Sequence, residues 1–523
     1  MCELRHGAGW AGVFASFAWC DRHRSRPGTL QAMTFGDRPF LASEIELKLD
    51  MTPEAAEALL SSGLLPAEPA VSELRAIYFD TPEQELGAAG FSLRIRRTGD
   101  RRIQTVKAVG ESVASLFVRP EWEQTVEDDV PVLDDTTPVK ALLGARAGML
   151  RPVFEIAVTR LTWPVVWQGA QIELALDRGE IVAGDRYTPV CEIELELKAG
   201  DPATLFSYAR RIDAQAPLRL GVFTKAERGY RLRGPALIAA AAEPVHLSED
   251  MGVENAFRAI AGSCIRQFRL NEALFERGNV EVVHQARVAL RRLRSALTAF
   301  APVAGDDALE RLKDGLRWLA GVLGAVRDLD VLIPERRDAA ERAALEQSRR
   351  KAFDKAAAAL ASPRARALML DLSEWLACGD WRHRPSSAEM RAMPLRDFAI
   401  SALGRLRRKV KKHGRDLADL DDEARHRLRK DAKKLRYAAE FFACLFHGRK
   451  QQRRYGHFLE TLKTLQDALG MLNDRANTSR HLAEAGVILP ETEVPESRAD
   501  EAKMLKAAVE AYDTFCDARR FWR

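Results

Sequence analysis

The sequence has no apolar run long enough to span a bilayer, so we expect no membrane partner. Its seven cysteines are scattered, odd in number and include no Cys-x-x-Cys pair, which argues against a disulfide framework or a zinc site. This cysteine usage favours a reducing compartment, and we expect a cytoplasmic protein. A large excess of one charge is also missing, because the formal net charge is only +5 at pH 7. The basic residues are nevertheless clustered, and their positions are informative.

A chain of 523 residues is long enough for two or three domains, and the hydrophobic patterns divide it. Residues 1–40 are expected to be a poorly ordered N-terminal extension, with Met33 as a candidate start. Residues 41–235 are rich in strand patterns, and 236–250 form a linker. From residue 251 to 523 the period becomes that of helices. We therefore predict a multi-domain α+β protein.

The stretch Glu44-Ile45-Glu46-Leu47-Lys48 alternates polar and apolar residues, as a half-buried strand does. A second copy runs from Glu192 to Lys198. Carboxylates and an ammonium on one face are costly to enclose unless a cation and an anion lie among them. For one such strand, a solvated sheet face is the better interpretation. Two copies facing one cavity instead predict oxygen ligands for a hard divalent metal.

Basic side chains follow other predicted strands of the first half. Arg94 and Arg96 share one face of residues 91–97, and Lys107 lies on the predicted hairpin partner, residues 102–108. About eight strands thus carry charge on one face, with basic and acidic residues segregated. A closed barrel with a polar interior explains this pattern better than an open sheet. The segregation predicts an anion on one wall and a metal on the other.

These residues resemble the CYTH, or triphosphate tunnel metalloenzyme, family over residues 41–235. The resemblance is carried, in order, by Glu44-x-Glu46-x-Lys48, Tyr78-Phe79-Asp80-Thr81, Leu93-Arg94-Ile95-Arg96, Gln104-Thr105-Val106-Lys107, Arg119-Pro120-Glu121-Trp122-Glu123, Glu192 to Lys198, and Lys225-Ala226-Glu227-Arg228-Gly229-Tyr230.

The resemblance implies an eight-stranded antiparallel tunnel that hydrolyses inorganic triphosphate with Mg²⁺ or Mn²⁺. It implies catalytic roles for Glu44, Glu46 and Lys48, and metal binding by Glu44, Glu46, Glu194 and Glu196. It implies that the phosphates contact Lys48, Arg94, Arg96, Lys107, Arg160, Lys225 and Arg228.

The helical half contains an internal repeat. His284-x-x-Arg287-x-x-x-Arg291-Arg292-Leu293-Arg294 matches His426-x-x-Arg429-x-x-x-Lys433-Lys434-Leu435-Arg436, and Leu323-Gly324-x-x-Arg327-Asp328 matches Leu469-Gly470-x-x-Asn473-Asp474. Two related bundles of about four helices are therefore expected. Spacings of 3, 7 and 10 residues place His284, Arg287, Arg291 and Arg294 on one helical stripe, and His426, Arg429, Lys433 and Arg436 on another.

Like charges at these spacings repel, and a bound polyanion would offset that repulsion. The alternative is a solvated basic face, or ion pairs with acids such as Asp328 and Asp474. Duplication of the stripe, including its histidine, favours function. This half resembles the CHAD domain over about residues 250–520, which implies binding of inorganic polyphosphate.

Nucleic acid is the rival ligand, but the basic segments lack interleaved aromatics apart from Tyr437 and Tyr455, and no reading-helix motif is present. We therefore rank polyphosphate ahead of nucleic acid. Two alternatives to the triphosphatase stay open. One is a non-catalytic polyphosphate-binding protein located at polyphosphate granules. The other is a nucleotide-acting tunnel enzyme, either an adenylate cyclase or a nucleoside or thiamine triphosphatase.

Overall fold

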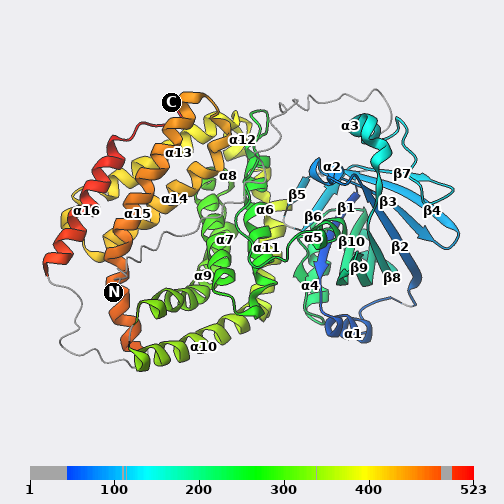
Figure 1. Ribbon diagram of the computed structural model, residues 1–523, viewed down its shortest axis with the longest axis horizontal. Helices are drawn as coiled ribbons and strands as arrows, with labels where there is room; N and C mark the ends of the chain where they lie inside the picture. Colours follow the sequence, from blue (N-terminus) through cyan, green and yellow to red (C-terminus); the bar gives the residue numbers. More distant parts are fainter. Residues whose placement is uncertain (1–43, 67, 109–110, 114, 337, 485–497) are drawn as a thin grey trace, which may run out of the picture. The chain divides into compact units, whose positions relative to one another are not determined.

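The computed structural model describes residues 44–484 and 498–523, except for residues 67, 109, 110, 114 and 337. The predicted N-terminal extension, residues 1–40, lies outside this part. The expected α+β class is confirmed, since antiparallel strands form the first half and helices the second (Figure 1). No helix in the described ranges is long and apolar enough to cross a membrane.

The strands are β1 (Glu44–Asp50), β2 (Ala70–Asp80), β3 (Phe91–Thr98), β4 (Arg101–Ala108), β5 (Glu111–Val113), β6 (Leu116–Arg119), β7 (Glu121–Thr125), β8 (Arg151–Trp167), β9 (Ala170–Ala183), β10 (Arg186–Ala199) and β11 (Arg219–Leu220). The helices of this half are α1 (Pro53–Ser61), α2 (Glu85–Ala88), α3 (Val139–Leu143), α4 (Ala203–Asp213) and α5 (Lys225–Arg233). Helix α1 begins where the sequence Thr52-Pro53 predicts, with the Thr52 hydroxyl accepting from the Ala55 amide at 3.2 Å.

The sheet closes on itself through one interrupted strand. Its order is β5-β6-β1-β10-β9-β8-β2-β3-β4-β7, and all described pairs are antiparallel. Strands β6 and β7 are consecutive, separated only by Pro120, which has no amide proton to donate. Strand β6 pairs with β1, whereas β7 pairs with β4. Counting β6–β7 as one strand completes the expected eight-stranded tunnel.

Alternation sorts the side chains between the two faces of the tunnel wall. Leu47 and Leu49 of β1 are fully buried and belong to a hydrophobic cluster with Leu205 and Phe206 of α4, on the outside. Glu46 and Lys48 of the same strand point inward and are only 3% and 5% exposed. The apolar face therefore fixes the register, and this register directs the charged face into the tunnel.

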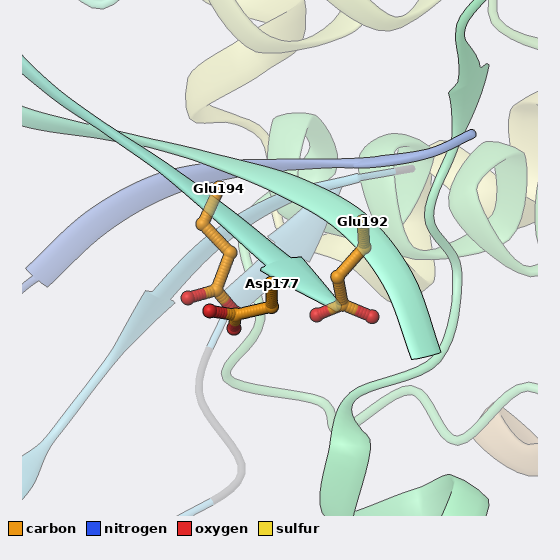
Figure 2. Close-up of side chains that lie close together, drawn as sticks. All are labelled: Asp177, Glu192 and Glu194. Atoms are coloured by element: carbon orange, nitrogen blue, oxygen red, sulfur yellow. The ribbon is translucent and has the colours of Figure 1, made fainter. Parts of the chain in front are cut away.

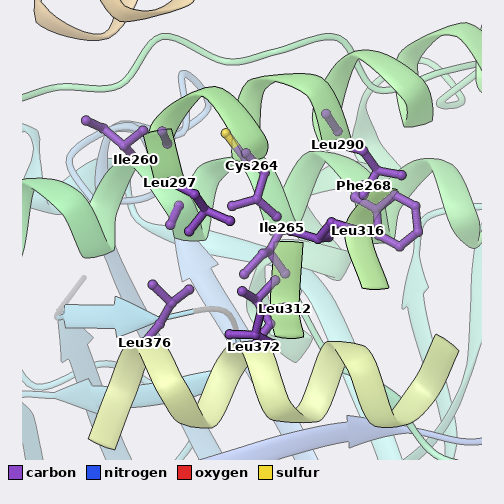
Figure 3. Packing of buried hydrophobic residues seen from close by; sticks show 14 of the residues in the cluster. Ile260, Cys264, Ile265, Phe268, Leu290, Leu297, Leu312, Leu316, Leu372 and Leu376 are labelled. Carbon is purple, nitrogen blue, oxygen red and sulfur yellow. The ribbon is translucent and has the colours of Figure 1, made fainter. Parts of the chain in front are cut away.

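The second half contains α6 (Val253–Glu272), α7 (Val280–Ala299), α8 (Ala301–Ala304), α9 (Asp307–Leu332), α10 (Ala339–Ala361), α11 (Pro363–Cys378), α12 (Ala388–Ala392), α13 (Leu395–His413), α14 (Asp422–Phe442), α15 (Arg449–Glu484) and α16 (Arg498–Asp517). Phe268, Leu290, Leu316 and Leu372 pack between α6, α7, α9 and α11 (Figure 3). The first repeated motif lies on α7 and α14, and the second on α9 and α15.

Candidate functional site

An acidic cluster lies on the inner face of the tunnel, where β9 and β10 are neighbours (Figure 2). Asp177, Glu192 and Glu194 each contribute a carboxylate oxygen, and these oxygens lie within 4.8 Å of one another. The ammonium of Lys225, from α5, lies 2.6 Å from Asp177, 2.5 Å from Glu192 and 3.0 Å from Glu194. A cation of the protein itself therefore lies among the three carboxylates.

Further cations surround this cluster. Arg160 of β8 contacts Asp177 and Glu194, each at 2.6 Å, and Lys48 forms an ion pair with Glu194. Burial alone would raise the pKa of Glu194, but Lys225, Lys48 and Arg160 outweigh it and hold that pKa well below its usual value. Burial likewise opposes the charge of Lys225, yet the carboxylates raise its pKa well above normal. The cluster is thus charged and compensated at neutral pH.

Helix α5 brings Lys225 and Arg228 to the tunnel, with Arg228 lying 3.1 Å from Glu192. The helix is anchored farther along its length. The Tyr230 hydroxyl donates to Asp80 at 2.8 Å, and Gly229 passes so close to the Phe154 ring that an added Cβ would lie 2.3 Å from it. Only glycine permits this approach. The sequence motif predicted roles for Lys225 and Arg228 but did not predict a helix there.

The carboxylates of Glu44, Glu46 and Glu196 form a second group on adjacent strands. Glu46 is the direct partner of Glu196 across the β1–β10 ladder, and it pairs with Arg119. Glu44 contacts Lys107 at 2.7 Å. The pKa of Glu196 is raised by burial and by the charge of Glu44, even though Lys198 opposes the shift. Glu46 also lies 3.4 Å from Lys48, and Glu196 lies 2.6 Å from Lys198. Each carboxylate thus has a cation of the protein beside it, but the raised pKa of Glu196 indicates that an added divalent cation would be favourable there.

The wall formed by β3 and β4 presents hydrogen-bond donors. Arg94 makes only long contacts, 3.5 Å to the Tyr78 hydroxyl and 3.9 Å to Glu121. Its Nε is buried and makes no hydrogen bond within the part of the chain that the structure describes. Arg96 lies two residues along the same face. Lys107 also contacts Glu121, at 3.0 Å. Buried donors without acceptors suit phosphate oxygens, which would satisfy them.

In the helical half, the two basic stripes lie on neighbouring helices, because α7 packs against α14. Burial lowers the pKa of Arg291, and Arg287, Arg436 and Arg429 lower it further. The Nε atom of Arg291 is buried and makes no hydrogen bond among the described residues. Two other stripe residues have carboxylate partners, because Arg436 Nε lies 3.4 Å from Glu440 and Arg287 lies 2.8 Å from Asp328. Guanidinium groups stay charged at any ordinary pH, so Arg291 keeps its charge although burial and neighbouring cations both disfavour it.

The glycines of the second repeated motif contact the guanidinium groups of two stripe residues. The Arg287 guanidinium packs over Gly324, with a Cβ there lying 3.5 Å from the guanidinium carbon, and donates to the Gly324 carbonyl at 3.2 Å. Arg429 lies over Gly470 in the same way, 3.1 Å from the position of a Cβ. The two copies of the repeat therefore build the same local arrangement. In the second copy, His426 Nδ1 lies 2.6 Å from Asn473 Oδ1.

Comparison with known families gives one match for each half of the chain. Residues 42–230 match the CYTH domain family, and residues 259–483 match the CHAD domain family. The chain contains a CYTH domain followed by a CHAD domain. Both resemblances predicted from sequence motifs are thereby confirmed, whereas the roles of individual residues stay predictions.

Several relatives are similar to parts of this chain. An inorganic triphosphatase of Haemophilus influenzae is 31% identical over 203 residues, which is 37% of this chain and about half, 55%, of the relative. An uncharacterized protein of Mycobacterium tuberculosis is 25% identical over 448 residues, covering 77% of this chain and 83% of the relative.

Among solved structures, the CHAD domain of the plant Ricinus communis matches with a TM-score of 0.42 and 31% identity, over 55% of this chain and 94% of that one. A Hippeastrum protein described as an adenylyl cyclase with a dominant triphosphatase activity matches with a TM-score of 0.28 and 18% identity. The match covers 36% of this chain and 95% of that one. Both TM-scores lie below 0.5.

Sequence reasoning left several CYTH-domain residues out of the site. Asp177 and Glu192 complete the acidic cluster, Glu121 lies opposite Lys107, and Arg119 pairs with Glu46. Asp177 ends an alternating stretch in the sequence, but its partner across the ladder is Glu192, which only strand pairing reveals. Because β6 and β7 contact different neighbours, the inward direction of Arg119 also depended on the closure of the tunnel.

Proposed function

We propose that the CYTH domain hydrolyses inorganic triphosphate to diphosphate and orthophosphate with the help of Mg²⁺ or Mn²⁺. The observation that carries this proposal is the opposition of two walls inside one tunnel. One wall holds the carboxylates Glu44, Glu46 and Glu196, where burial and the charge of Glu44 raise the pKa of Glu196. The other wall holds Arg94, whose buried Nε makes no hydrogen bond within the described residues. The similarity to an inorganic triphosphatase supports the proposal.

The residues divide the chemical work between them. Arg94, Arg96 and Lys107 bind and orient phosphate oxygens, which reduces charge repulsion during attack. Lys225 and Arg228 can exchange part of their contacts with carboxylates for contacts with phosphate. Water adds to the terminal phosphorus as the bridging P–O bond breaks, and diphosphate leaves with the electron pair.

Glu44, Glu46 and Glu196 would hold the divalent metal, with Glu194 as the fourth predicted ligand. When bound, the metal neutralises phosphate charge and lowers the pKa of water. Glu194 already contacts Lys48, Arg160 and Lys225, so its place in the ligand set would require some of these ion pairs to open. Lys48 contacts Glu194 and also lies 3.4 Å from Glu46. If the metal took Glu194 from it, Lys48 could therefore keep Glu46 as a partner.

For the CHAD domain we propose binding of inorganic polyphosphate along the α7–α14 stripes. Burial and the charges of Arg287, Arg436 and Arg429 lower the pKa of Arg291, and the buried Nε of Arg291 makes no hydrogen bond in the described part of the chain. A chain of phosphates supplies evenly spaced charge and acceptors without demanding base recognition. In the cell, such binding would place the protein at polyphosphate granules in the cytoplasm.

The decisive experiment measures orthophosphate release from triphosphate, ATP and long-chain polyphosphate, with Mg²⁺, with Mn²⁺ and with chelator. We expect rapid, metal-dependent release from triphosphate. Release from ATP alone would favour a nucleotide-acting tunnel. Absence of release from all three substrates would reject the hydrolase.

One observation favours the non-catalytic alternative. Lys225 already lies among Asp177, Glu192 and Glu194, where a metal could otherwise bind. If protein cations occupied all the carboxylates, no metal could bind, and the tunnel would bind phosphate without hydrolysing it. Binding of triphosphate with equal affinity in metal and in chelator, without turnover, would establish that alternative.

A further inference from the structure

A buried carboxylate on α14 organises three basic side chains outside the two stripes. Asp431 is only 3% exposed. Its Oδ2 lies 2.8 Å from His413 Nδ1, and its Oδ1 lies 3.1 Å from the Lys434 ammonium and 3.3 Å from that of Lys409. His413 and Lys409 belong to α13, so the cluster joins two helices.

The charge of this cluster is not balanced. One carboxylate faces two ammonium groups and an imidazole, and it holds the imidazole through Nδ1, which leaves Nε2 directed elsewhere. The side chains of His413, Lys434 and Lys409 are 30%, 30% and 45% exposed, so their remaining donors reach solvent. Ordinary surface lysines lose much side-chain entropy when they bind an anion. Here a buried anchor has already restricted all three donors.

The cluster lies beside the second stripe on α14. An α-helix turns about 100° per residue, so Lys430 lies between the stripe residue Arg429 and the cluster residue Lys434 around the helix. Burial lowers the pKa of Lys430, and the nearby charges of Arg294 and Lys434 lower it further. Because Arg294 belongs to the first stripe, positive charge continues from α7 across α14 to α13.

We propose that His413, Lys409 and Lys434, held by Asp431, form a phosphate-binding seat that extends the polyphosphate path from the stripes onto α13. This inference rests on the proposed polyphosphate binding by the CHAD domain. The ligand class is a phosphoanhydride chain, whose next phosphates would contact the seat after crossing Lys430. The competing explanation is a brace that only ties α13 to α14.

The two explanations predict different changes in polyphosphate affinity for Asp431→Asn. If Asp431 is only a brace, removal of a negative charge near a polyanion site leaves affinity unchanged or increases it. If Asp431 organises the donors, the variant binds long-chain polyphosphate roughly threefold to tenfold more weakly. The measurement is the Kd of the full chain for polyphosphate, at fixed salt, with thermal unfolding recorded alongside.

Single charge removals separate the seat from general electrostatics. Lys434→Met and His413→Gln should each weaken binding by roughly threefold or more, whereas the matched variant Lys412→Met, an exposed lysine on α13, should change Kd by less than about twofold. Equal losses for Lys434→Met and Lys412→Met would overturn the seat. These variants decide the question even if Asp431→Asn does not fold.

A stripe variant distinguishes this inference from the proposed function. If Arg291→Met loses affinity while the seat variants do not, polyphosphate binding stands and the seat is wrong. If the unmodified chain does not bind polyphosphate, both fail. If short chains of about five phosphates are insensitive to Lys434→Met while long chains are sensitive, the seat is the extension that we propose.

Discussion

The CYTH tunnel and the CHAD stripes both concentrate basic side chains, but they compensate them differently. In the tunnel, Lys225 and Arg160 contact carboxylates at 2.5–3.0 Å, and their pKa values are raised despite burial. In the stripes, Arg291 and Arg294 are half-buried, and burial together with neighbouring cations lowers their pKa values. The same residue types therefore stabilise the fold in one domain and oppose it in the other.

Under the two proposed functions, this difference would provide two ways to bind phosphate. The balanced interior of the tunnel would exchange internal ion pairs for contacts with the proposed substrate and metal, and would restore them when products leave. In the stripes, Arg287 pairs with Asp328 and Arg436 with Glu440, and a long polyanion would supply further counter-charge. Binding to the stripes is then expected to depend steeply on salt, whereas the buried ion pairs of the tunnel are screened little.

The largest expected effect is on catalysis in the tunnel. Glu46→Gln should lower kcat for triphosphate by roughly 100- to 1000-fold, because it removes a buried charge from the group that would hold the metal. Polyphosphate binding should be unchanged. The measurement is phosphate release, with Glu180→Gln, at an exposed position on β9, as the control. Retention of activity within threefold would remove Glu46 from the site.

The next effect is on the stability of the tunnel. Lys225→Met leaves Asp177, Glu192 and Glu194 with less compensation, so the free energy of unfolding should fall by about 3–5 kcal/mol. Urea unfolding measures this change. The control, Lys140→Met, removes a half-exposed lysine that pairs with an exposed carboxylate, and it should cost less than about 0.5 kcal/mol. Similar losses for both variants would contradict a balanced, buried cluster.

The same type of substitution in the stripes should have the opposite consequence for stability. Arg291→Met removes a half-buried cation from among other cations, so the free energy of unfolding should stay within about 0.5 kcal/mol or rise. Its Kd for polyphosphate should increase roughly tenfold, because a charge-assisted hydrogen bond is lost. Arg350→Met, at an exposed position on α10, is the control. A large loss of stability would show that Arg291 is compensated after all.

The smallest effect concerns pH. Burial and the charge of Arg327 lower the pKa of His284, while burial and Lys430 lower that of His426. Both imidazoles are thus neutral at pH 7 without ligand. A bound polyanion raises these pKa values, so binding takes up protons, and affinity should increase roughly threefold to tenfold from pH 8 to pH 6.

Stability of the free domain should change in the other direction. Because the folded pKa values lie below 6.5, the unfolded chain binds protons first, and stability is lost as pH falls through and below that value. The double variant His284→Gln with His426→Gln should flatten both trends. An unchanged pH dependence of Kd in that variant would assign the effect to other groups.

Much of the tunnel could be predicted from the sequence, because alternation is local. The stretch from Glu44 to Lys48 shows its inward and outward residues directly, and the Leu47 side chain confirms the face by packing outside. The helix α5 could not be assigned from alternation, since its short stretch carries mostly polar residues. Asp177 was missed because its role depends on its partner across the ladder, Glu192.

The CHAD stripes could likewise be read from helical spacing, and their duplication strengthened the prediction. The spacing does not show which helix faces which, so two features emerged only from the structure: the packing of α7 against α14, and the contacts of Asp431 on α14 with Lys409 and His413 on α13. The glycines of the second motif were recognised as repeated in the sequence. Their contacts with Arg287 and Arg429 were visible only in the tertiary structure.

The sequence by itself determined the two domains, the charged face of each strand and the stripe on each helix, because these follow from periods of 2 and 3.6 residues. The tertiary structure decided how charges are matched. Strand β6–β7 closed the tunnel, Lys225 entered the acidic cluster from α5, and two stripes met on neighbouring helices. Ion pairing depends on distances between residues far apart in the chain, and local periodicity carries no information about those distances.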